Sequence, residues 1–138
     1  MAARIDLTLR IILADPPAGV VFAKQDAQSR PVDPVRAAGG DLAFDIPITL
    51  TSTPDGPRPG GGFVRADGRG RFVYVASGQA AGDAQATGQR RIKIYLHDLP
   101  ADLAGGEVLE AAIAGRAKDG GPAFATVPLL SGWRRIRS

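Results

Sequence analysis

The sequence predicts an all-β protein, an antiparallel two-layer β-sandwich of about eight short strands with at most one or two helical turns. Several segments alternate between apolar and polar residues, which is typical of half-buried strands. The 138 residues include 18 glycines and 11 prolines, so turns are frequent, and 44% of them are hydrophobic, which is enough for a core. Because a sheet with one apolar face must cover another, we expect two packed sheets in a single domain over residues 1–138.

The first strand is expected over residues 5–13, where every second residue is apolar. Residues 15–19, Asp-Pro-Pro-Ala-Gly, would end it, because two prolines and a glycine suit a tight turn and cannot continue a ladder. Residues 20–25 are expected to return as a short strand. Residues 28–40 contain two prolines and a pair of glycines, and they predict a surface connection.

The clearest alternation lies in residues 41–52, which we expect to form the central strand. Its apolar residues share one face: Leu42, Phe44, Ile46, Ile48 and Leu50. Burying each of these side chains is worth roughly 1.5–3 kcal/mol, so this row is a large part of the predicted core. Pro47 has no N–H group and predicts a bulge or a position on a sheet edge.

The middle of the chain alternates between loops and strands. Residues 53–62 hold three prolines and four glycines and predict a flexible loop. Residues 71–77 are apolar on both faces, as in a strand that is covered on both sides or lies near a sheet centre. Residues 78–88 predict a loop of small residues. Residues 89–97 alternate again, with Ile92, Ile94 and Leu96 facing inward.

The last third is predicted to contain a helical turn and three strands. Asp98 could cap a single helical turn over residues 98–103. Residues 107–115 have helical propensity, yet they are so short that we expect a strand. A sharp turn is expected at residues 119–122, followed by strands over residues 123–130 and 133–136.

Few residues are suited to catalysis or metal binding. The chain has no cysteine and one histidine, His97, so a zinc site has too few ligands. Ser77 lacks the Gly-x-Ser-x-Gly setting of a hydrolase nucleophile, and no glycine-rich loop carries the Lys-Ser/Thr of a phosphate-binding loop. Calcium binding by loop aspartates stays open as an alternative. We expect no catalytic residue, no metal and no cofactor.

The net charge of +3 allows an anionic partner without requiring one. Residues 69–74, Arg-Gly-Arg-Phe-Val-Tyr, match part of the strand on which RNA-recognition domains stack bases. The positive charge is nevertheless scattered, and the two long helices of that fold have no candidates here. Nucleic-acid binding is therefore an alternative that the sequence does not favour. The N-terminal segment fits neither a signal peptide nor a membrane span, so we expect a cytoplasmic protein.

The favoured hypothesis is a non-enzymatic module that binds a ligand or a protein through loops at one end of the sandwich, because function commonly sits on loops held by a rigid scaffold. A basic patch beside these loops would contact an anionic ligand or an acidic protein. The candidate binding residues are Asp15, Arg71, Tyr74, Arg90, Arg91, Lys93 and Asp119. Alternatives are a small enzyme with a cleft around His97 and Asp119, and a homodimer formed through a strand edge in place of a monomer.

Four short motifs follow one another along the chain, each occurring once. They are residues 15–20, Asp-Pro-Pro-Ala-Gly-Val; residues 71–75, Arg-Phe-Val-Tyr-Val; residues 90–94, Arg-Arg-Ile-Lys-Ile; and residues 119–122, Asp-Gly-Gly-Pro, followed by Ala-Thr-Val-Pro at residues 125–128. In this order the sequence resembles a family of short bacterial proteins of unknown function, from Ile5 to Trp133. The resemblance implies a single-domain bacterial protein and brings no substrate, cofactor or catalytic residue.

Overall fold

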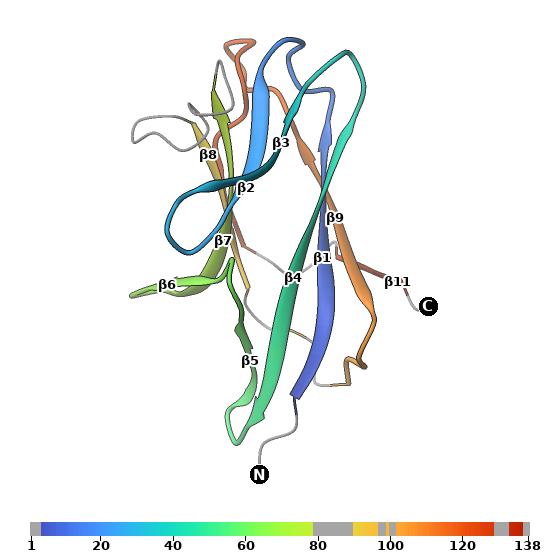
Figure 1. Cartoon of the computed structure of the whole chain (residues 1–138), viewed down its shortest axis with the longest axis vertical. Helices are drawn as coiled ribbons and strands as arrows, with labels where there is room; N and C mark the ends of the chain where they lie inside the picture. The colour runs from blue at the N-terminus through green and yellow to red at the C-terminus, as the bar shows by residue number, and fades with distance from the viewer. Residues whose placement is uncertain (1–3, 79–89, 97–98, 100–101, 129–132, 137–138) are drawn as a thin grey trace.

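The computed structural model describes residues 4–78, 90–96, 99, 102–128 and 133–136. These residues form eleven strands in two sheets that pack face to face (Figure 1). The strands are β1 (Arg4–Ala14), β2 (Val21–Gln25), β3 (Pro31–Arg36), β4 (Leu42–Thr53), β5 (Gly56–Gly60), β6 (Arg65–Asp67), β7 (Gly70–Gly78), β8 (Arg91–Tyr95), β9 (Val108–Ala114), β10 (Ala125–Pro128) and β11 (Arg134–Ile136). The predicted all-β two-layer sandwich is confirmed.

The first sheet has the strand order β11-β9-β1-β4-β5. Its centre is the long antiparallel pair of β1 and β4, in which Leu9 lies opposite Ile46. β9 runs parallel to β1 on the other side, so this sheet is mixed. The alternation read from residues 5–13 and 41–52 is the inward face, and both Leu9 and Ile46 are fully buried.

The second sheet has the order β10-β8-β7-β2-β3, with β6 paired to β7. All its pairs are antiparallel except β8 with β10. Its inward face supplies Phe22, Val73, Val75, Ile92 and Ile94 to the core shared with the first sheet. The prediction that residues 71–77 are covered on both sides is confirmed, because Phe72 on the opposite face is also buried.

Three strands were not predicted: β3 and β5 lie where the sequence indicated a connection and a loop, and β6 lies between residues 62 and 71, where no element was assigned. These are short, outlying strands, and backbone pairing stabilises them without a row of buried apolar side chains. β5 is Gly-Pro-Arg-Pro-Gly, and its two prolines lie opposite Leu50 and Ser52 of β4. Prolines at every second position turn their nitrogens to one side, and since these nitrogens cannot donate, that side is the outer edge.

Two further predictions agree with the structure. Residues 107–115 form a strand, β9, because each of its residues pairs with β1. Pro47 lies on a sheet edge, since β5 pairs with β4 only from Thr49 onward. The helical turn expected at residues 98–103 falls largely outside the described residues, as does the loop expected at residues 78–88. The described residues include no helix that could span a membrane.

Candidate functional site

Several loops meet at one end of the sandwich, the upper end in Figure 1. The β1–β2 turn contacts the β3–β4 loop, where the Asp15 N–H donates to the Asp41 carboxylate at 3.0 Å. The β1–β2 turn also lies beside the β9–β10 connection, because Arg116 Nε is 3.6 Å from Asp15 Oδ2. The loops that the sequence places far apart are therefore neighbours in space.

The β9–β10 connection is a folded excursion and not an open loop. The Ala117 N–H donates to the Gly121 carbonyl at 2.9 Å, and the Ala123 N–H donates to the Gly115 carbonyl at 3.0 Å. Gly115 is required at the base, because a Cβ there would lie 2.9 Å from the Ala14 carbonyl oxygen. The excursion is thus locked against the end of β1.

Arg90, at the start of β8, holds the tip of this excursion. Its Nη2 donates to Asp119 Oδ2 at 2.5 Å, and its Nη1 donates to Asp119 Oδ1 at 3.1 Å and to the Pro122 carbonyl at 2.9 Å. A guanidinium fork on a carboxylate is a charge-assisted, bidentate contact. It lowers the pKa of Asp119 to about 2, so this carboxylate is ionised and already occupied near neutral pH.

The glycine pair at residues 120–121 makes this contact possible. Gly120 has φ of +83°, in the region that favours glycine, and a Cβ on Gly121 would lie 2.9 Å from Arg90 Nη1. The Gly121 N–H also donates to Asp119 Oδ1 at 2.9 Å. The Asp-Gly-Gly-Pro motif therefore binds the Arg90 guanidinium, and we call residues 119–122 the Arg90 seat.

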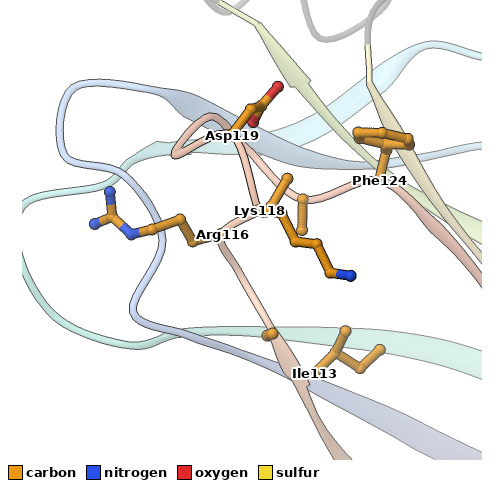
Figure 2. A pocket seen from close by; sticks show the side chains of 8 residues that line it. Ile113, Arg116, Lys118, Asp119 and Phe124 are labelled. Carbon is orange, nitrogen blue, oxygen red and sulfur yellow. The ribbon is translucent and has the colours of Figure 1, made fainter.

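Beside this seat lies a pocket of about 460 Å³, which we call the loop-end pocket. Its lining residues are Ile113, Ala114, Arg116, Ala117, Lys118, Asp119, Ala123 and Phe124. In Figure 2 the Lys118 side chain extends toward the side on which Ile113 and Phe124 lie, whereas Arg116 extends the other way. Phe124 is 59% exposed, and the Arg90 guanidinium lies 4.9 Å from the centre of its ring.

A second group of polar and aromatic residues covers the outer face of the second sheet. This outer-face cluster consists of Arg65, Asp67, Phe72, Tyr74, Arg91, Lys93 and Tyr95. Lys93 bonds to Asp67 and lies 4.1 Å from the centre of the Phe72 ring, and the Tyr95 hydroxyl donates to Asp67 at 2.7 Å. The Lys93 bond, aided by that of Tyr95, holds the pKa of Asp67 well below its usual range.

The structure separates the predicted binding residues into two groups and a remainder. Asp15, Arg90 and Asp119 belong to the loop end, as predicted for the loops. Tyr74, Arg91 and Lys93 lie on the outer face of the second sheet. Arg71 lies near the start of β7, beside β6, and joins neither group. His97 lies outside the described residues, so its predicted role is not addressed.

Sequence reasoning missed Lys118 and Phe124 in the pocket and Arg65 and Asp67 in the cluster. Phe124 was expected within a strand, yet β10 begins only at Ala125. An aromatic residue directly after Asp-Gly-Gly-Pro-Ala was the available signal, because a glycine- and proline-rich turn cannot bury it. Arg65 and Asp67 carried no signal, because their partners on β7 and β8 are set by a strand that the sequence did not predict.

The described geometry bears on some of the alternatives from the sequence. Phe72 and Tyr95 are buried and packed edge to face with ring centres 5.8 Å apart, so they present no open ring to a base. Within the described part of the chain, no three potential metal-ligating side chains come together. Asp119 is held by Arg90, which does not suit a proton-transferring group.

One comparison with known proteins gives a match. A family of unknown function (DUF5990) matches residues 7–136 of the chain. No curated protein and no solved structure matches it. The matched residues run from β1 to β11 and thus include both the loop-end pocket and the outer-face cluster.

Proposed function

Since the chain belongs to DUF5990, a family of unknown function, we propose from the site itself that the protein is a non-enzymatic binding module whose loop-end pocket takes an anionic ligand with an apolar body. The observation that carries the proposal is the pairing of Lys118 with an apolar lining. Lys118 has no ion-pair partner among the described residues, while Ile113, Ala123 and Phe124 line the same pocket.

The charges around the pocket favour an anion. Arg90 neutralises Asp119, the one carboxylate in the lining, so the cations Arg116 and Lys118 are left in excess. Arg116 contacts Asp15 only at 3.6 Å, and Asp15 is itself well exposed. A carboxylate beside Lys118 would meet a positive field at the rim of the pocket.

Phe124 supplies the apolar side. Fully burying a phenylalanine side chain is worth roughly 1.5–3 kcal/mol, and because 59% of Phe124 is exposed, a ligand that covers it could gain about half of that. The Arg90 guanidinium on the ring holds it in place, and a flat ligand could lie against its remaining surface. A single exposed phenylalanine is ordinary, and it is the adjoining pocket that gives this one a binding role.

Three probes with one apolar body test the proposal: 3-phenylpropionate, 3-phenylpropanol and 3-phenylpropylamine, each titrated and followed by NMR. We expect the carboxylate to bind best, by up to about fivefold over the alcohol, since an exposed ion pair contributes ~0.2–1 kcal/mol. Lys118→Glu should reverse the order in favour of the amine. Phe124→Ala should weaken all three.

Matched controls are available elsewhere on the surface. Arg58→Glu on β5 makes the same change of charge as Lys118→Glu. Val35→Ala removes the large apolar side chain that, with Phe124, is exposed among the described residues, and it is 40% exposed. Neither should alter the three affinities. Equal affinity for the three probes, or binding that survives Phe124→Ala and Lys118→Glu unchanged, would refute the loop-end pocket as the site.

A further inference from the structure

The register of the strands determines which side chains are neighbours on the outer face of the second sheet. On β8 and β7, Arg91 lies opposite Ala76, Lys93 opposite Tyr74, and Tyr95 opposite Phe72. Alternate residues share a face, so all six point away from the core that Val73 and Ile94 enter. β6 adds Arg65, which lies opposite Phe72 on the other side of β7. Three cations are thus gathered around three rings.

The partners of these cations differ. Lys93 is bonded to Asp67, so its charge is compensated. Arg65 Nη1 donates to the Ser29 hydroxyl at 2.7 Å, a neutral acceptor. Arg91 has no hydrogen bond or carboxylate partner among the described residues, and its Nε is buried without an acceptor. Its one described contact is with the ring of Tyr74, whose centre is 5.1 Å from the guanidinium carbon.

A buried guanidinium N–H without an acceptor is unusual in a native protein, because buried donors are nearly always bonded. Because the Nε is closed to solvent, an incoming ligand would meet the two Nη groups of Arg91, and a guanidinium group matches the oxygens of a phosphate or carboxylate. Arg65 lies 5.3 Å from the same ring centre, and because β6 and β8 pair with opposite sides of β7, the two guanidinium groups come from opposite sides of the strand that carries Tyr74.

We propose that Arg91, held on the ring of Tyr74, binds a phosphate group, while Arg65 adds positive charge from the other side of that ring. Two guanidinium charges favour a doubly charged tetrahedral oxyanion over a single carboxylate. The nearby Asp67 does not oppose this, because Lys93 and the Tyr95 hydroxyl already engage it. The site is separate from the loop-end pocket and does not depend on the ligand proposed there.

The test titrates inorganic phosphate at constant ionic strength, with sodium chloride as the balancing salt, and follows the arginine Nε–H signals by NMR. We expect the Arg91 Nε–H signal to move in a saturable way. Arg91→Gln should weaken phosphate binding at least about tenfold, because a hydrogen bond to a charged group is worth ~1.5–3 kcal/mol. Arg58→Gln, a matched change on β5, should leave it unchanged.

A second variant keeps the proposal testable if Arg91→Gln does not fold. Arg91→Lys retains the charge and loses the fork, so it should fold and bind phosphate several-fold more weakly. Phenyl phosphate distinguishes the source of the group: tighter binding than inorganic phosphate supports a phosphomonoester, and equal binding supports free phosphate. The proposal is overturned if the Arg91 signal moves equally in chloride alone, or if both Arg91 variants bind phosphate like the wild type.

Discussion

Replacing Arg135 with alanine should destabilise the protein strongly, because it leaves a buried carboxylate without its main partner. Arg135 lies on β11, and its Nε and Nη2 donate to Glu107 at distances of 2.9–3.1 Å. The Glu107 side chain is only 4% exposed, whereas that of Arg135 is 24% exposed. The Ala104 N–H also donates to the Glu107 carboxylate, at 2.5 Å.

The size of the effect follows from this burial. Removing one partner of a buried ion pair costs about 3–5 kcal/mol, and because water can approach through the Arg135 side we expect about 3 kcal/mol. An unfolding entropy of about 2.1 cal/mol/K per residue converts this to a fall in Tm of about 10 °C for a chain of this length. The loss should free β11 from β9 and leave the far sheet intact.

Thermal unfolding followed by circular dichroism measures this shift, and Asp102→Asn provides the matched control. Asp102 bonds to the same guanidinium at 3.0 Å but is 72% exposed, so its loss should cost less than about 1 kcal/mol. The reasoning is refuted if Arg135→Ala lowers Tm by less than 2 °C (roughly 0.6 kcal/mol by the same conversion), or if Asp102→Asn is equally costly.

Two further predictions concern the loop end. Gly115→Ala should destabilise the protein by about 1–3 kcal/mol, because its Cβ would meet the Ala14 carbonyl at 2.9 Å and the backbone must shift, while Gly40→Ala, which meets nothing within 4 Å, should be neutral in urea unfolding. The Arg90–Asp119 pair should make stability pH-dependent: a lowered folded pKa gives stability that is present above the unfolded value of 3.8 and is lost as the pH falls toward about 2. The stability difference between wild type and Asp119→Asn should therefore shrink over that window, and a difference as large at pH 2 as at neutral pH would contradict the assignment.

Much of the fold could be predicted from periodicity, since β1 and β4 bury one face each and their alternation is unbroken. The outlying strands could not, because β5 and β6 owe their pairing to backbone bonds and to neighbours far along the chain. The two parallel pairs, β9 with β1 and β10 with β8, could not be predicted either. The direction of these strands depends on the path of the connections and not on the local residue pattern.

The candidate site was predicted in part. The first turn, which contains Asp15, lies beside the β9–β10 connection, which contains Asp119, because Arg116 contacts Asp15. Arg90 and Arg91 were expected to act jointly, but adjacent residues of a strand face opposite ways, and each guanidinium serves a different surface. The unpaired state of Arg91 depends on which acids lie near it, which requires the three-dimensional arrangement.

The prolines at the borders of the two sheets affect how this protein can meet other molecules. Pro57 and Pro59 remove donors along the rim of β5, and β3, at the border of the other sheet, contains Pro31 and Pro34. A strand from another chain would find fewer N–H groups to pair with at these two borders, so strand addition there is disfavoured. Recognition at these borders then depends on side chains, and selectivity for a partner can be changed by point substitutions without disturbing the backbone.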